Sequence, residues 1–171
     1  LNNSILAVIG GAISWIFIPL GWGNWQSAVA TITGLIAKEN VVSTFGVLFG
    51  GFDEVAENGW QVWENMRAVF TPVAAYSFLV FNLLCAPCFA AIGAIKREMN
   101  STKWTLFAIG YQTAFAYVVS FIIYQLGTLF TVGVTSVFSI VGAIIAFGLI
   151  VFILFMMFRP YKEATKLTKK I

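Results

Sequence analysis

The sequence has few charged residues for its length. Lys, Arg, Asp and Glu make up 10% of the 171 residues, against about 25% in an ordinary soluble domain. Ten basic and seven acidic side chains are too few to cover the surface of a soluble fold of this size. This shortage excludes a soluble globular enzyme, and the 60% of hydrophobic residues excludes a disordered or fibrous protein.

Several residue types and motifs are also missing. Histidine is absent, which removes the commonest metal ligand and general base. No GxxxxGK(S/T) run is present to bind phosphate, and two cysteines are too few for a secreted disulfide framework. A net charge of +3 is no nucleic-acid signature, so we expect no nucleic-acid partner. The chain starts at Leu1 without a signal-peptide pattern, and we expect it to be an internal or C-terminal piece of a longer protein.

Long apolar runs are the main feature that is present. A helix needs about 20 apolar residues to cross the hydrocarbon core of a bilayer. Three runs reach this length without a charge: residues 72–95, 104–126 and 134–158. A shorter run covers residues 4–20, and a run over residues 25–49 is long enough but carries Lys38 and Glu39. The sequence therefore predicts an all-α polytopic membrane protein with four or five spans.

An amphipathic segment lies between the runs, over residues 60–70. Its apolar side chains recur at helical spacing while Glu64 and Arg67 fall elsewhere, which predicts a helix in the membrane interface. The tryptophans lie near predicted span ends, where their rings favour the interface. These residues are Trp15, Trp22, Trp25, Trp60, Trp63 and Trp104.

The loop charges predict an orientation. The connection over residues 95–104 and the tail after Phe158 are basic, and we expect both on the cytoplasmic side. The uncharged connection over residues 126–134 and the acidic segment 50–71 are then outside. The basic tail is explained as a topology determinant and a lipid anchor.

A polar strip interrupts the run over residues 25–49. A charge at the centre of a span costs about 2.5–3.5 kcal/mol on insertion scales, so Lys38 and Glu39 need a reason to be there. Adjacent helical residues do not face each other, which makes these two a poor ion pair. Helical spacing instead groups Glu39 with Ser43, and Asn40 with Thr44 and Thr33, giving oxygen ligands along one side.

Gly34 allows close packing or a helix break next to this strip. A broken helix at mid-membrane, with freed carbonyls and one carboxylate, is a recurring cation site in transporters. The alternative is that the helix ends near Ala37 and leaves the charges at a wet interface.

A second candidate lies inside the first uncharged run. Pro87 cannot donate to the carbonyl of Leu83, so a bend and a free acceptor are predicted there. Cys85 and Cys88 are three residues apart and are expected on one helix face, beside Asn82. Thiolates suit soft or borderline metals such as Fe(II), Cu(I) and Zn. The alternatives are cysteines acting as small hydrophobes around a tolerated kink, or a thiol redox pair.

Together these residues resemble the C-terminal membrane part of FeoB-type ferrous iron transporters. The resemblance covers nearly the whole chain and rests on blocks in a specific order. These are FIPLG at 17–21 with Trp25, AVATITGLIAKENVV at 28–42, Pro87-Cys88, AIKRE at 94–98 and Lys103-Trp104. The block at 28–42 looks like the second of the family's two Gate modules.

The resemblance implies a function for the chain. The family moves Fe(II) into bacterial cells across the cytoplasmic membrane, in which this multi-pass chain would lie with a cytoplasmic C-terminus. The bilayer, an N-terminal GTPase domain, a first Gate module and small cytosolic iron-transport accessory proteins are the implied partners. GTP would bind only in the missing domain, Fe(II) is the transported ion, no cofactor is permanently bound, and this fragment is not an enzyme.

The spans, the polar strip and the Pro87 kink, taken together with the resemblance, give a division of the chain and a set of site residues, of which Glu39 and Cys88 match the family's blocks. Residues 1–50 are the second Gate-type module, 51–71 an external loop with the interfacial helix, 72–158 a three-span bundle and 159–171 a basic cytoplasmic tail. The expected Fe(II) ligands are Glu39, Cys88, Asn40, Ser43 and Asn82. The expected pore or hinge residues are Lys38, Pro87 and Gly34. Cys85 departs from the family, whose members commonly carry an aromatic residue there, and it inherits no role.

Two other functions stay open at this point. A Gate-type transporter of another solute, either a different divalent cation or a nucleoside, fits the same pattern of spans. A membrane thiol oxidoreductase using Cys85 and Cys88 fits less well, because the sequence holds no second cysteine pair to relay electrons.

Overall fold

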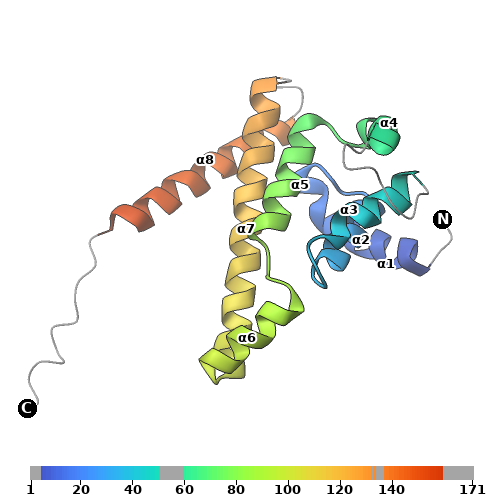
Figure 1. Ribbon diagram of the computed structural model, residues 1–171. Coiled ribbons are helices and arrows are strands. Elements are labelled where there is room, and N and C mark those ends of the chain that lie inside the picture. The colour runs from blue at the N-terminus through green and yellow to red at the C-terminus, as the bar shows by residue number, and fades with distance from the viewer. Residues whose placement is uncertain (1–4, 51–59, 132, 134–136, 160–171) are drawn as a thin grey trace, which may run out of the picture.

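The fold is built from helices (Figure 1). The structure is a computed structural model that describes residues 5–50, 60–131, 133 and 137–159, and all regular elements in these ranges are helical. The elements are α1 (Ile5–Ser14), η1 (Trp15–Leu20), α2 (Trp25–Gly34), α3 (Asn40–Phe45), η2 (Gly46–Gly50), α4 (Trp60–Val69), α5 (Pro72–Leu84), α6 (Phe89–Met99), α7 (Thr102–Thr131) and α8 (Val137–Phe158). The predicted all-α fold class is confirmed.

Three helical segments are long and apolar enough to cross a membrane. They are Pro72–Met99, Thr102–Thr131 and Ile140–Phe158, which confirms the three uncharged runs. A fourth span is possible only as a bent pair, because Ile5–Leu20 and Trp25–Gly34 meet at 97°. The run over residues 25–49 is not one continuous span, since its helix ends at Gly34 and a new one begins at Asn40.

Local sequence explains where the helices begin. Asn24 caps α2, because its side-chain oxygen accepts a hydrogen bond from the Ser27 N–H at 2.8 Å. Thr71 caps α5 in the same way, accepting from the Ala74 N–H at 3.2 Å. Pro72 follows at the first helical position, where its missing N–H costs nothing.

The long helix α7 is the element on which η1, α5, α6 and α8 pack. It runs beside α5 (Figure 1), and the buried Ser77 hydroxyl of α5 donates to the Ser120 carbonyl of α7 at 3.1 Å. The same helix holds the N-terminal part of the chain, because the Tyr117 hydroxyl donates to the Ile16 carbonyl at 2.8 Å. α7 therefore joins segments that are about a hundred residues apart in sequence.

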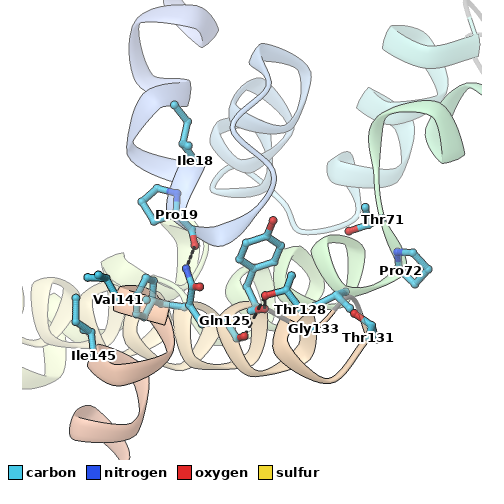
Figure 2. Close-up of a pocket in the computed structure, with 14 residues that line it drawn as sticks. Ile18, Pro19, Thr71, Pro72, Gln125, Thr128, Thr131, Gly133, Val141 and Ile145 are labelled. Atoms are coloured by element: carbon cyan, nitrogen blue, oxygen red, sulfur yellow. Dashed lines mark hydrogen bonds between the residues drawn. The ribbon is translucent and has the colours of Figure 1, made fainter. Parts of the chain in front are cut away.

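A pocket of about 870 Å³ lies between η1, the start of α5, α7 and α8. Figure 2 shows Gln125 at its wall, donating to the Pro19 carbonyl at 3.3 Å. Thr128, which also lines the pocket, bonds to carbonyls of its own helix. The lining residues are otherwise mostly apolar, and none of the predicted Fe(II) ligands is among them.

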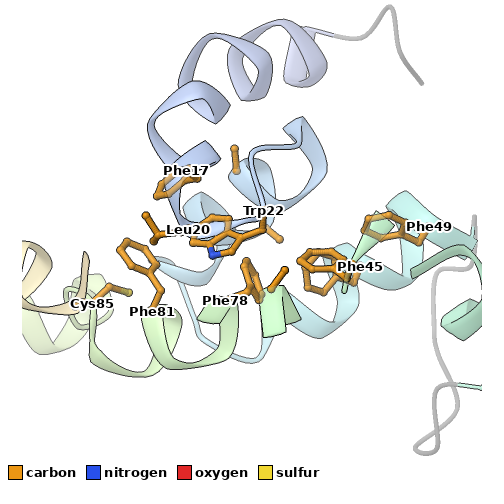
Figure 3. Packing of buried hydrophobic residues seen from close by; sticks show 13 residues of the cluster. Phe17, Leu20, Trp22, Phe45, Phe49, Phe78, Phe81 and Cys85 are labelled. Atoms are coloured by element: carbon orange, nitrogen blue, oxygen red, sulfur yellow. The ribbon is translucent and has the colours of Figure 1, made fainter. Parts of the chain in front are cut away.

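The core is a cluster of aromatic rings (Figure 3). Trp22 is only 1% exposed and stacks on Phe17 with ring centroids 4.3 Å apart. Its ring also meets Phe78 edge-on at 5.0 Å, and Phe78 in turn contacts Phe45 of α3 at 5.1 Å. Trp22, which the sequence predicts near a span end, is buried inside the protein by neighbouring rings.

The amphipathic character predicted for residues 60–70 is confirmed where the structure describes the side chains. Glu64 and Arg67 are exposed, and Phe70 is buried in the aromatic cluster. The side chains of Trp60 and Trp63 lie outside the described part of the chain. The helix is fixed to η2 by Asn65, whose side-chain amide donates to the Phe49 carbonyl at 2.6 Å.

Two neighbouring residues of α5 test the importance of the aromatic cluster. Phe78 is 2% exposed and Leu79 is 63% exposed. We expect Phe78→Ala to lower the free energy of unfolding by about 3–5 kcal/mol, because it leaves a cavity among packed rings. Leu79→Ala removes a side chain from the surface and should change it by less than about 0.5 kcal/mol. Unfolding in detergent measures both, and equal losses would contradict this account of the core.

Candidate functional site

Two interruptions between helices lie against each other in this structure, and we call the place where they meet the crossing. One break, residues 35–39, separates α2 from α3, and the other, residues 85–88, separates α5 from α6. The Lys38 ammonium nitrogen donates to the carbonyls of Asn82 at 2.8 Å and Leu83 at 3.1 Å. In return the Phe89 N–H donates to the Leu35 carbonyl at 3.0 Å. Each break thus satisfies backbone groups that the other leaves free.

Proline chemistry explains the break after α5. The last turn closes with the Cys85 N–H donating to the Phe81 carbonyl at 2.8 Å. Pro87 has no N–H to offer the Leu83 carbonyl, and residues that precede proline avoid helical backbone angles. The free acceptor predicted at Leu83 is confirmed, and Lys38 is the group that occupies it.

The break after α2 is a tightened turn followed by a restart. The Leu35 N–H donates to the Ile32 carbonyl at 3.1 Å, and the Asn40 N–H donates to the Ala37 carbonyl at 3.0 Å. Lys38 and Glu39 therefore lie in the interruption. The two predictions for this segment, a broken helix and a helix that ends near Ala37, each describe part of it. The helix ends before Ala37, as the alternative expected, and α3 then continues the chain as a broken helix.

Two threonine hydroxyls join the two sides of this break. The Thr33 and Thr44 hydroxyl oxygens are 2.9 Å apart, with either able to donate. The sequence placed these two residues with Asn40 on one polar strip of a helix, and the structure instead brings their hydroxyls into direct contact because the helix breaks between them. The hydrogen bond fixes α3 against the end of α2 without using the charged residues.

Gly34 is needed where the two breaks approach. A methyl group at this position would lie 2.7 Å from a methyl group of Val41 and 3.8 Å from the side-chain oxygen of Asn82. The Asn82 side-chain amide donates to the Phe78 carbonyl at 2.9 Å. Absence of a side chain at Gly34 thus allows α2, α3 and Asn82 to meet.

The structure gathers some of the predicted site residues and separates others. Lys38, Gly34, Asn82 and Pro87 meet at the crossing. Glu39 precedes α3, and its side chain is exposed together with those of Asn40 and Ser43. Cys88 precedes α6 and is half-buried. Within the described ranges no group of three His, Cys, Asp or Glu side chains is close enough to hold a metal ion.

The two cysteines do not share a helix face, so that prediction is wrong. α5 ends at Leu84, one residue before Cys85, and Cys88 lies at the start of the next helix. Cys85 is buried in the aromatic cluster, where its thiol contacts the Asn82 carbonyl at 3.4 Å. Both thiols are free. Cys85 is thus a packing residue, and only Cys88 is placed to act as a ligand.

This arrangement offers weak, mostly neutral ligands. Two main-chain oxygens bind Lys38 at the crossing, and the Glu39 carboxylate and the Cys88 thiol belong to the two breaks that form it. Such sets suit a cation that binds and leaves again better than one held permanently. The sequence pointed to the free carbonyl through Pro87, but the pairing of that carbonyl with Lys38 depends on how the two breaks cross.

Comparison with known proteins identifies the segment that carries the crossing. The sequence pattern of the Gate family, described as nucleoside recognition, matches residues 1–102. The chain belongs to the Gate family. Both breaks lie inside the matched Gate segment, whereas nearly all of α7 and all of α8 lie beyond it.

Several curated proteins are similar to this Gate chain. The Fe(2+) transporter FeoB of Staphylococcus aureus is 38% identical over 130 residues, covering 76% of this chain and 19% of that protein. The Fe(2+) transporter FeoB of Methanocaldococcus jannaschii is 39% identical over 129 residues, covering 75% and 18%. An Fe(2+) transport protein A/Fe(2+) transporter FeoB fusion protein of Porphyromonas gingivalis is 38% identical over 138 residues, covering 75% and 16%.

The resemblance predicted from the sequence is confirmed by these relatives. The chain spans only about a fifth of the length of the curated relatives it matches. No solved structure matches the chain.

Two glycines in the Gate segment test the close approach at the crossing. A methyl group at Gly93 of α6 would meet nothing within 4 Å, unlike one at Gly34. We expect Gly34→Ala to lower the free energy of unfolding by about 1–3 kcal/mol, because Val41 must move. Gly93→Ala should be neutral or stabilising through its better helix propensity. Thermal unfolding in detergent compares them, and an equally tolerated Gly34→Ala would argue against the close approach.

Proposed function

We propose that this chain is the C-terminal membrane part of a ferrous iron transporter and that Fe(II) passes where the two helix breaks cross. One observation carries the proposal: the Lys38 ammonium of one helix break binds the two carbonyls that the other break leaves without helical partners, in a chain similar to FeoB proteins. Helix interruptions of this kind line cation paths in other transporters. We take Fe(II) as the transported ion because the relatives are named Fe(2+) transporters.

The proposed ligands act in succession along this path. Glu39 supplies negative charge and carboxylate oxygens, and Cys88 supplies a soft ligand that suits Fe(II). Asn40, Ser43 and Asn82 supply neutral oxygens, and Gly34, Pro87 and Lys38 shape the crossing. The exposure of Glu39, Asn40 and Ser43 supports a role on an open path, since none of them is committed to the core.

The remaining parts of the proposal concern the longer protein. We place this chain in the cytoplasmic membrane with its C-terminus inside, divided at the boundaries predicted from the sequence. A GTPase domain and a first Gate module would precede it. The relative named as a fusion with Fe(2+) transport protein A supports a small iron-transport protein as a further partner.

Iron uptake in cells carrying the full-length protein tests the site residues. We expect Glu39→Gln and Cys88→Ser each to lower Fe(II) uptake by at least about tenfold, a loss typical of residues that serve a metal site. Glu98→Gln at the end of α6 removes a carboxylate away from the crossing and is the matched control, which should retain most uptake.

Two results would contradict this proposal. Undiminished uptake in both site variants would remove Glu39 and Cys88 from the path. The second result is a competition experiment in which Mn(II), Zn(II) or nucleosides suppress the uptake of labelled Fe(II) as effectively as unlabelled Fe(II) does. That result would show that iron is not the preferred solute.

A further inference from the structure

The Lys38 ammonium occupies a set of oxygens that would otherwise be available to a free cation. It donates to the carbonyls of Asn82 and Leu83, the two residues that precede Leu84 at the end of α5. Carbonyls at a helix C-terminus carry the negative end of the helix dipole and attract positive charge. Lys38 comes from a separate segment, so its charge is delivered to α5 from outside the helix.

These oxygens lack ordinary helical partners. The Leu83 carbonyl has none because Pro87 has no N–H. The Asn82 carbonyl would bond to the N–H of Ala86, but α5 has already ended at Leu84. Its other contact is the Cys85 thiol at 3.4 Å, which is a weak donor. With Lys38 withdrawn, the carbonyl oxygens of Asn82 and Leu83 would be open to another cation, and oxygens of this kind are ligands that hard and borderline divalent cations accept.

The crossing does not depend on Lys38 alone. The Phe89 N–H to Leu35 carbonyl bond joins the same two breaks, and the Thr33–Thr44 pair fixes α3 separately. Lys38 itself lies outside any helix and is exposed, and its ammonium is carried on a flexible four-carbon side chain. The lysine is therefore able to leave its acceptors while the two breaks stay together.

We propose that the carbonyls of Asn82 and Leu83 form a divalent-cation site and that Lys38 closes it by occupying the same oxygens. An ammonium and a divalent cation repel strongly at the separation of shared ligands, so only one of them binds at a time. Entry of the ion displaces Lys38, and its departure lets Lys38 return. This inference rests on the proposed function and adds to it a gate within the path.

Lys38→Met tests the gate in the full-length protein, purified and reconstituted into vesicles under anaerobic conditions, with Fe(II) as the probe. We expect Lys38→Met to tighten Fe(II) binding by at least about tenfold, because it removes a competing charge from the site. It should also raise passive Fe(II) entry. Lys38→Arg, which keeps the charge, should resemble the unchanged protein. Lys103→Met, which removes a charge at the start of α7, is the matched control and should change neither quantity.

Pro87→Ala tests the same oxygens from the other side. The alanine N–H competes for the Leu83 carbonyl, so this variant should weaken Fe(II) binding, both alone and combined with Lys38→Met. Thermal unfolding of each variant shows that it is folded. A mere structural brace at Lys38 would predict lower stability without any gain in binding.

The outcomes separate the gate from the transport function. In the first outcome, the unchanged protein takes up Fe(II), and the folded Lys38→Met variant has the same Fe(II) affinity and the same passive Fe(II) entry. The proposed gate is then contradicted, and the transport function stands. If Lys38→Met loses stability and binds no more tightly, Lys38 is a brace and the gate is again wrong. If the unchanged protein neither binds nor takes up Fe(II), the transport function fails and the gate fails with it.

Discussion

The missing N–H of Pro87 is the constraint on which the candidate site depends. It leaves the Leu83 carbonyl without a helical partner and ends α5 inside what would otherwise be a single span. An unpaired backbone oxygen is costly in a membrane, where no bulk water replaces the lost bond. The chain satisfies it with the ammonium of Lys38, which is itself costly to place at that depth. Two groups that are unfavourable alone are thus stable together.

The rest of the fold holds this pairing in place. The rings of Trp22, Phe78 and Phe81 pack the N-terminal segment onto α5, just before the break. α7 packs on the same cluster and is joined to α5 through the Ser77 hydroxyl and to η1 through the Tyr117 hydroxyl. Rigid packing around an irregular backbone segment is what allows the segment to keep unusual hydrogen bonds. The regular packing around the site thus allows its irregular backbone to persist.

Much of the architecture could be predicted from the sequence, because a span needs a long apolar run and a run is a local property. The helices after residue 71, the amphipathic α4 and the free acceptor at Leu83 all follow from local chemistry. What could not be predicted depends on distant contacts. Trp22 is buried because Phe17 and Phe78 cover it, and Cys85 leaves the face of Cys88 because α5 stops one residue earlier. The Lys38 acceptors lie more than forty residues away in sequence.

The central claim is that a divalent cation binds where the breaks at residues 35–39 and 85–88 cross. Anomalous diffraction at the iron absorption edge, from crystals of the full-length protein loaded with Fe(II), tests it most directly. The account predicts an anomalous peak beside the carbonyls of Asn82 and Leu83, with the Lys38 side chain turned away from them. A peak elsewhere, such as in the pocket between η1, α7 and α8, with Lys38 still bonded to both carbonyls, would contradict it.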